Sequence, residues 1–311
     1  MVRHTLLQIL FVFANVGTSI IAESFSVSSS SDNGSIAVFG CGVLGTSLCK
    51  QLLSSSDFDS RLVTGITKTS NRHDGIREQI PSERFSVKTY DEIAGTKFRD
   101  VIFCAPPSGS EDYPGAIKDA IQNLWDGPSG GGHFVFTSSG GIYGIGNDGA
   151  MVTEDTPVAD PEKNPRVAKL VEAERICKEG GGCVLRLAGL YNLERGAHNY
   201  WLESGNDVKG REDGFINLLH YDDAAGACVA ALKVDPSSVA GKAFLISDGN
   251  PTSRKGICES ARKAAMYSEK AMPKFLGEST DPKGKIYDGT KSNAALKWNP
   301  RYSSFDKFMS I

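Results

Sequence analysis

The 311-residue sequence lacks the signatures of several common protein classes. No run of lysine and arginine is longer than two residues, and the 34 basic side chains are balanced by 37 acidic ones. A net charge of -3 provides no basic footprint for nucleic acid and too little self-repulsion to keep the chain unfolded. The hydrophobic content of 40% is that of a folded protein, which at this length buries a sizeable core without disulfides.

Metal-binding motifs are absent as well. The five histidines are scattered without a His-Glu-x-x-His pattern, and no two cysteines stand in Cys-x-x-Cys spacing, so no metal site is expected. The seven cysteines are an odd number, and Cys41, Cys104 and Cys183 lie in glycine-rich or apolar segments that favour small buried side chains. This set is typical of a reducing compartment, although Asn33-Gly34-Ser35 is a glycosylation sequon.

The first residues have the layout of a targeting leader. A short basic start precedes residues 5–22, which carry no charge, and small residues then place a cleavage site before Phe25. This predicts a removed signal peptide, with a membrane anchor as the alternative. The Ser-rich residues 26–31 make the segment similar to the bipartite leaders of algal complex plastids. We therefore expect residues 1–34 to be a cleaved leader to an organelle, a plastid or else the secretory pathway, with no stable membrane anchor afterwards.

From residue 35 onward, short apolar strands alternate with amphipathic helices. Strands are expected at 36–39, 61–66, 85–89, 101–105, 134–137 and 183–187, and helices at 44–53, 112–125 and 167–178. The alternation predicts right-handed βαβ units and an α/β fold with a doubly wound parallel sheet. After Tyr191 the alternation loosens, and 216–219 and 243–246 are expected to be isolated strands.

Three glycines mark the first turn between a strand and a helix, in Gly40-Cys41-Gly42-Val43-Leu44-Gly45. In this G-x-G-x-x-G pattern Gly40 permits the tight turn, Gly42 lets a pyrophosphate approach the backbone, and Gly45 allows the helix to pack closely. The N-terminus of the helix, at Val43 and Leu44, offers free N–H groups to the phosphates. The pattern predicts a Rossmann-type NAD(P)-binding domain over 35–190, with a smaller substrate-binding lobe over 191–311 packed on it.

The end of the second strand indicates which dinucleotide is bound. NAD sites usually place an acidic residue about 20 residues after the glycines, and this chain has none there before Asp74. Thr67, Lys68 and Arg72 offer hydroxyl and cationic donors to a 2′-phosphate instead. We expect NADP as the cofactor, with NAD as the alternative; an ordinary solvated loop would also carry such residues.

Further segments extend the pattern in a fixed order: Cys104–Pro107, Phe136–Gly144, Leu185–Tyr191, Asn217–Ala224 and Leu245–Pro251. Over about residues 35–305 the chain resembles the NAD(P)-dependent epimerase/dehydratase superfamily of extended short-chain dehydrogenases/reductases, and its glycine loop is similar to an atypical branch. The resemblance implies hydride transfer on a small hydroxyl- or carbonyl-bearing substrate, sugar-like among them. It also implies a set of residues near the cofactor, namely Ala105, Pro106, Thr137 and Ser138. Ser139 would bind the substrate oxygen, although hydroxyls there also cap the strand.

The chain departs from this family at the acid/base, a tyrosine four residues before a lysine on the next helix. Aligning Glu174 with the family puts Arg166 and Leu170 at those positions, and aligning Lys169 puts Pro165 at the tyrosine position. Neither alignment provides a phenol. As a cation, Arg166 would orient an anionic substrate without serving as a base.

Other residues are candidates for the missing proton carrier. Tyr143 follows the serine loop, and His220 opens a later helix, where capping and packing are the simpler explanation. Tyr287-x-x-x-Lys291 has the family's spacing, but it comes near the C-terminus and is expected to be structural and to lie outside the cofactor-binding lobe. A further set after the sixth strand faces either a polar substrate or solvent: Arg195, His198, Tyr200 and Trp201.

Two functions from different classes fit these residues. One is an NADP-dependent oxidoreductase or epimerase, a monomer or homodimer that acts on a small molecule. The other is an NADP-binding regulatory or chaperone-like module without turnover, which the missing helix tyrosine favours. The retained Ser139 favours the enzyme.

Overall fold

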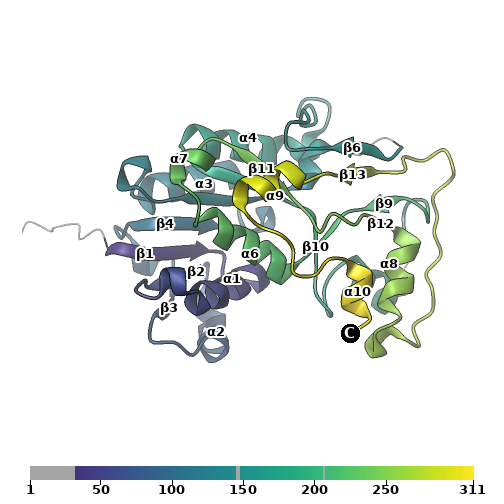
Figure 1. Ribbon diagram of the computed structural model, residues 1–311, viewed down its shortest axis with the longest axis horizontal. Coiled ribbons are helices and arrows are strands. Elements are labelled where there is room, and N and C mark those ends of the chain that lie inside the picture. The colour runs from purple at the N-terminus through teal and green to yellow at the C-terminus, as the bar shows by residue number, and fades with distance from the viewer. Residues whose placement is uncertain (1–31, 145–147, 206) are drawn as a thin grey trace, which may run out of the picture.

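The computed structural model describes residues 32–144, 148–205 and 207–311 (Figure 1). The predicted leader therefore lies, up to residue 31, outside the described residues. A seven-stranded sheet forms the centre of the molecule, in the order β11-β7-β5-β4-β1-β2-β3. Its strands are β1 (Asp32–Phe39), β2 (Val63–Thr67), β3 (Phe85–Thr89), β4 (Phe98–Phe103), β5 (Phe134–Ser139), β7 (Cys183–Leu187) and β11 (Ala243–Ile246). All neighbours pair in parallel, which confirms the predicted Rossmann-type sheet.

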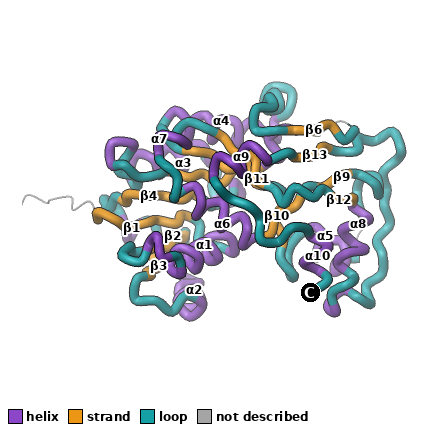
Figure 2. The backbone as a smooth tube through the Cα atoms, viewed as in Figure 1, coloured by secondary structure: helices purple, strands orange, loops and turns teal. Residues whose placement is uncertain are grey.

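Helices cover both faces of this sheet (Figure 2). On one face α1 (Val43–Ser54) packs against α6 (Tyr221–Ala231), with α2 (His73–Gln79) and α9 (Thr290–Leu296) nearby; on the other α3 (Tyr113–Asn123) packs against α4 (Pro165–Glu179). Strand β1 shows why both faces are covered: Ile36 and Val38 join the core under α1, while Ala37 joins the core under α3, and all three are fully buried.

A smaller lobe is built from two-stranded pieces and short helices. Its strand pairs are β8 (Gly189–Tyr191) with β10 (Leu218–His220), β9 (Phe215–Ile216) with β12 (Thr252–Ser253), and β6 (Ala150–Val152) with β13 (Lys285–Tyr287). Its helices are α5 (Ala197–Ser204), α8 (Arg254–Ala261) and α10 (Phe305–Met309), around a core that includes Tyr191, Tyr267 and Phe305. Figure 1 shows this lobe beside one end of the main sheet.

Two expectations for the C-terminal third are corrected. Residues 243–246 are not an isolated strand, because β11 pairs with β7 as the edge of the main sheet. Residues 216–219 contribute to two strands, β9 and β10, rather than one. The short helix α7 (Pro236–Val239) and α9 also return to the main sheet, so the chain after residue 190 contributes to both parts of the molecule.

All seven cysteines are free, and six of them are buried. Within the described ranges, no helix is both long and apolar enough to cross a bilayer.

The carboxyl group of Asp248, just after β11, is buried in the smaller lobe, and only one of its two oxygens has a hydrogen-bond partner among the described residues. Its Oδ1 accepts a hydrogen bond from the Asn250 backbone N–H (2.8 Å), but its Oδ2 and the nearby Tyr191 hydroxyl lack partners in the described structure. Burial, together with the charge of Asp223, raises the pKa of Asp248 to about 7. The carboxyl is therefore a weak point of the fold whenever it is charged.

We expect Asp248→Asn to change the pH dependence of stability. The pKa of Asp248 is higher in the folded than in the unfolded protein, so between about pH 4 and pH 7 the folded protein binds a proton at Asp248 that the unfolded protein has lost. The free energy of unfolding of the wild type therefore falls as the pH rises through this range. The variant should match the wild type at pH 4 and exceed its free energy of unfolding by about 1–3 kcal/mol at pH 8. Urea unfolding across this range measures the effect.

The matched control is Asp306→Asn. The hydrogen bond and charge of Lys263 lower the pKa of Asp306, so this substitution should act in the opposite sense, and only weakly at the surface. Equal pH profiles for wild type and Asp248→Asn would show that water reaches the Asp248 carboxyl.

Candidate cofactor and substrate site

The three glycines of the loop have three different environments. Gly40 has φ +99°, and a Cβ there would lie 2.7 Å from the Cα of Ala105, so no other residue fits. A Cβ at Gly45 would overlap the carbonyl of Gly40, so it is the lack of a side chain at Gly45 that lets α1 start close to β1. At Gly42, by contrast, φ is -91° and a Cβ would meet nothing within 4 Å. Gly42 therefore leaves a space that the fold itself does not use.

That space lies at the N-terminus of α1. Gly42 is the N-cap residue, no side chain caps the helix, and its first turn contains no acidic residue. The N–H groups of Val43, Leu44 and Gly45 have no acceptor within the helix, as at any helix start. An open cradle with unpaired donors and a partial positive charge suits a diphosphate, so the residues present fit a dinucleotide.

A cavity of about 570 Å³ continues from the glycine loop between α1 and α2. Its lining includes Cys41, Gly42, Thr46, Asn71 and Arg72. Asn71 and Cys41 were not predicted as site residues, because nothing in their spacing separates them from an ordinary loop. The charged residues of the lining are Lys50, Arg72 and, on α6, Asp222, so that its charge is positive on balance, as expected for a site that binds an anionic ligand group.

The three residues predicted to bind a 2′-phosphate are placed differently. Arg72 lines the cavity. Thr67 is buried at the end of β2, where its hydroxyl lies 2.7 Å from His73 Nε2 and donates to the carbonyl of Thr69 (3.0 Å). Lys68 reaches across to the loop after β4 and donates to the Gly109 carbonyl (3.3 Å). Of these three residues, therefore, Arg72 is the one that lines the cavity, beside Lys50 and Asp222.

The residues predicted near the cofactor on β4 and β5 line the carboxyl ends of those strands. Ala105 and Pro106 lie just beyond the end of β4, and the backbone of Ala105 occupies the space that a Cβ at Gly40 would need. Thr137 donates to the Phe103 carbonyl (3.2 Å) and so ties β5 to β4. The bound nicotinamide half of a dinucleotide crosses this edge in Rossmann-type sheets.

The two serines at the end of β5 point to opposite sides. Ser138 is buried and donates to Glu174 Oε1 on α4 (2.6 Å), so its hydroxyl is committed to the core. Ser139 is exposed, and its Oγ accepts a hydrogen bond from the Gly141 N–H (3.0 Å). Ser139 thus caps the following turn, the role that the sequence analysis gave as the alternative to substrate binding. Because its oxygen accepts this hydrogen bond, its own proton is still available for a ligand.

A buried ion pair supports this turn from below. Arg186 on β7 binds Glu174 through Nε and Nη2, the latter at 2.8 Å from Oε2, and both side chains are at most 5% exposed. Arg186 Nη1 also donates to the Tyr143 hydroxyl (2.8 Å) and to the Glu154 carbonyl (3.2 Å). Apart from the presence of Glu174 in the helix, no sequence pattern predicted this network.

Tyr143 is held inside that network. It is 9% exposed, and burial raises the pKa of its phenol, although Arg186 opposes the rise. For Arg186, burial alone would lower the pKa, but the Glu174 carboxylate more than offsets this and raises it. The Tyr143 hydroxyl is accordingly neutral and directed toward Arg186.

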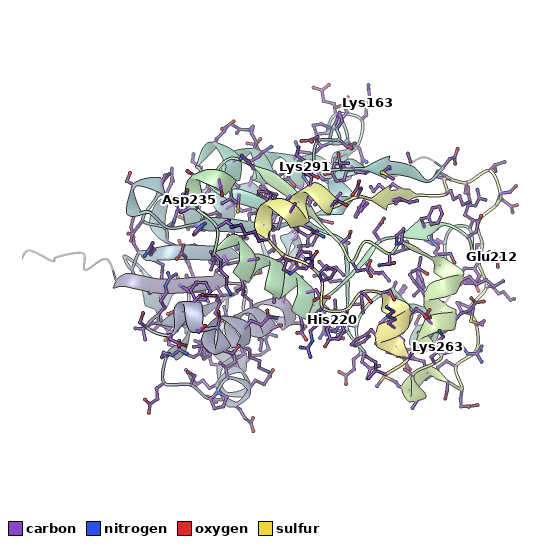
Figure 3. All side chains as sticks on the ribbon, in the orientation of Figure 1. Lys163, Glu212, His220, Asp235, Lys263 and Lys291 are labelled. Atoms are coloured by element: carbon purple, nitrogen blue, oxygen red, sulfur yellow. The ribbon has the colours of Figure 1, made fainter. Side chains whose placement is uncertain are left out.

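Tyr287 is on β13 of the smaller lobe, outside the main sheet, but its ring packs against the turn that follows Ser139. A Cβ at Gly140 would come within 2.6 Å of two ring carbons of Tyr287 and closer still to its hydroxyl. The rings of Tyr287 and Tyr143 meet edge to face, with centroids 6.2 Å apart. The Tyr-x-x-x-Lys spacing itself has no role, since Lys291 Nζ pairs with Asp155 Oδ2 (2.6 Å) on the exposed side of α9 (Figure 3).

The remaining candidates are structural residues, exposed residues or, for Arg166, a residue whose side chain the structure does not describe. His220 caps α6, where its Nδ1 accepts from the Asp222 N–H (3.1 Å), and Figure 3 places it between the two parts of the molecule. His198 is fully buried against Tyr267, with its Nε2 at 3.0 Å from the Leu193 carbonyl oxygen, whereas Arg195 and Tyr200 are exposed. The side chain of Arg166 lies outside the described part. Among the described residues, no group of three or more His, Cys, Asp or Glu side chains is arranged to hold a metal ion.

Comparison with known proteins identifies the fold. No protein-family model matches the chain. It is 18% identical to UDP-glucuronic acid 4-epimerase of Bacillus cereus in complex with NAD, with a TM-score of 0.66 over 89% of this chain and 96% of that one. The chain is 14% identical to dTDP-glucose 4,6-dehydratase of Bacillus anthracis in complex with NAD, with a TM-score of 0.67 over 89% of this chain and 94% of that one. It is 18% identical to UDP-glucose 4-epimerase of Thermotoga maritima with UDP-glucose, with a TM-score of 0.63 over 89% of this chain and 96% of that one.

The chain therefore has the fold of NAD-dependent epimerases and dehydratases, as the sequence resemblance predicted. One curated protein, pyrroline-5-carboxylate reductase 1 of Dictyostelium discoideum, is 33% identical over 90 residues. This match covers 29% of the chain but only 15% of that protein. At these identities the similarity is one of fold, and the reaction has to be argued from the site.

Proposed function

We propose that this protein is an NAD(P)-dependent oxidoreductase or epimerase that acts by hydride transfer on a small molecule bearing a hydroxyl or carbonyl group. The observation that carries the proposal is the open cradle at Gly42, which the fold keeps free at the N-terminus of α1. The epimerase of Bacillus cereus and the dehydratase of Bacillus anthracis are solved with NAD. The Bacillus cereus epimerase is also solved with UDP-glucuronic acid and the Thermotoga maritima epimerase with UDP-glucose, which makes a nucleotide sugar the first substrate class to test.

The chain's own residues would divide the work between the two ends of the site. The α1 N-terminus and the glycine loop bind the diphosphate, and Ala105 and Thr137 lie where the nicotinamide half crosses the sheet. The bound nicotinamide supplies or accepts the hydride. Ser139 is the exposed hydroxyl at the end of β5, and it would hold the substrate oxygen during transfer.

The proposal is tested by following nicotinamide absorbance with purified protein and a panel of nucleotide sugars, aldehydes and ketones. We expect at least one compound to be oxidised or reduced, and Gly42→Asp to remove that activity. If the wild type binds the dinucleotide tightly but turns over no compound in either direction, the alternative function of a binding module without turnover takes its place. The absence of a phenol at the family's tyrosine position favours this alternative, since that position holds Arg166 in one alignment and Pro165 in the other.

We propose NADP rather than NAD as the natural cofactor, because the cavity beside the glycine loop contains the Arg72 guanidinium. Arg72→Ala should weaken NADPH binding by about ten- to a hundredfold, the usual cost of a charge-assisted hydrogen bond, and NADH binding by less than about threefold. Fluorescence titration with both nucleotides measures the two dissociation constants.

Arg77→Ala, on the helix α2 that Arg72 precedes, is the matched control. Its guanidinium pairs with Asp74 (2.9 Å) at the exposed side of α2, so both nucleotides should bind as they do to the wild type. Equal losses of NADH and NADPH in Arg72→Ala would mean that Arg72 does not contact a 2′-phosphate.

A further inference from the structure

We propose that Tyr287, carried into the site by β13, is the phenol that exchanges a proton with the substrate oxygen bound by Ser139. The inference rests on the proposed function and supplies the acid/base that the α4 helix lacks. It depends on where the chain places Tyr287, Tyr143, Lys285 and Asn217.

The ring of Tyr287 lies against Gly140, the residue next to Ser139. Because Gly140 has no side chain, the Tyr287 hydroxyl occupies the space that a Cβ would take. No other described residue hydrogen-bonds to this hydroxyl, whereas the Tyr143 hydroxyl is already bound to Arg186. Of the two tyrosines beside the serine turn, Tyr287 alone has a phenolic oxygen that is free to bind a ligand.

The backbone of β13 is clamped where Tyr287 leaves it. The Asn217 side chain donates from Nδ2 to the Lys285 carbonyl (2.8 Å), and its Oδ1 accepts from the Tyr287 N–H (2.8 Å). On the other side β13 pairs with β6, with Tyr287 opposite Val152, and the Asp288 N–H donates to the Val152 carbonyl (2.9 Å). Because the backbone of β13 is hydrogen-bonded along both edges, the Tyr287 side chain starts from a fixed position, even though β13 belongs to a sheet of only two strands.

Lys285 places a cation beside the phenol. Residues two apart on a strand share a face, and the Lys285 ammonium lies 5.9 Å from the Tyr287 ring centroid and 5.8 Å from that of Tyr143. It donates to the Gly144 carbonyl, and burial lowers its pKa to about 8. Burial raises the pKa of the Tyr287 phenol, so the tyrosine is fully protonated and suited to give a proton to an alkoxide.

The step balances in the direction of reduction. The reduced nicotinamide would supply the hydride that forms the new C–H bond at the carbonyl carbon, and the π electron pair of the carbonyl would move to its oxygen. That oxygen takes the proton from Tyr287, whose O–H bond breaks and leaves a phenolate beside the Lys285 ammonium. Solvent then returns a proton to the phenolate, so one carbonyl, one hydride and one proton give one alcohol.

Kinetics of Tyr287→Phe, with Tyr143→Phe as the matched control, test the inference. We expect Tyr287→Phe to lower kcat by about 10²–10⁴-fold while the dissociation constant of the cofactor stays within about threefold of wild type. Tyr143→Phe should keep kcat within about tenfold. Lys285→Met should lower kcat without raising KM, and Lys285→Arg should restore part of it, because the cation acts through the phenol. A silent Tyr287→Phe together with an inactive Tyr143→Phe would overturn the inference and leave the proposed function standing.

A second measurement decides the matter even if no tested compound turns over. With tyrosines labelled at ¹³Cζ, the Tyr287 resonance is assigned by its loss in Tyr287→Phe. Adding NAD(P)⁺ should shift this resonance, since a charged nicotinamide ring would lie beside the hydroxyl, and should leave Tyr267 in the core of the smaller lobe unmoved. Cofactor binding without movement of Tyr287 overturns the inference alone, and absence of binding overturns it together with the proposed function.

Discussion

Gly42→Asp is expected to abolish dinucleotide binding and to leave the fold intact. The backbone at Gly42 has φ -91°, which any residue adopts, and a Cβ there meets no atom of the protein within 4 Å. The new carboxylate would therefore fill the space of the diphosphate and repel it, with no cost to packing. Calorimetric titration should show a loss of at least about a hundredfold in affinity, and the thermal midpoint without ligand should be unchanged.

The neighbouring glycines provide the contrast for that result. Gly42→Ala adds a methyl group without charge and should weaken binding less than the aspartate. Gly45→Ala should unfold the turn instead, because its Cβ would overlap the Gly40 carbonyl. If Gly42→Asp still binds the dinucleotide with wild-type affinity, the cradle at α1 is not the binding site.

The glycine loop could be predicted because its signal is local. Six adjacent residues between a strand and a helix specify the tight turn, the space for a pyrophosphate beside the backbone, and the close packing of the helix start. Each glycine has the environment that its position in the motif predicts. The same holds for the first six strands of the main sheet, where short apolar runs alternate with helices. The order of β11 could not be predicted, since a four-residue apolar run has the same pattern at the edge of a large sheet as in a small one.

The substrate end of the site could be predicted only in part. Ser139 is predicted from the family resemblance, by its spacing from Tyr143 and Gly144. The contact between Tyr287 and Gly140 could not be predicted, because it joins residues far apart in the chain and produces no periodic sequence pattern. Thr67 shows the opposite error, because a hydroxyl at the right place in sequence is already bound to His73. Hydrogen-bonding capacity depends on partners that only the folded chain brings together.

Glu174→Gln is expected to cost about 3 kcal/mol in the free energy of unfolding, because it leaves the Arg186 guanidinium buried without its counter-charge. The pair is 2% and 5% exposed and is bidentate, so water offers little compensation. Urea unfolding at neutral pH measures the loss. The serine turn should also loosen, since Arg186 holds the Tyr143 hydroxyl and Glu174 holds Ser138.

Two further variants separate the buried charge from the helix that carries it. Glu172→Gln removes a carboxylate from the same helix, where it pairs with Arg175 in solvent, and should barely change the midpoint. Glu174→Leu combined with Arg186→Met removes both charges and should recover most of the stability, because an apolar pair of similar volume avoids the desolvation of either ion. If the double variant is less stable than Glu174→Gln, the hydrogen bonds from Arg186 to Tyr143 and Glu154, rather than the ion pair, hold this edge of the sheet together.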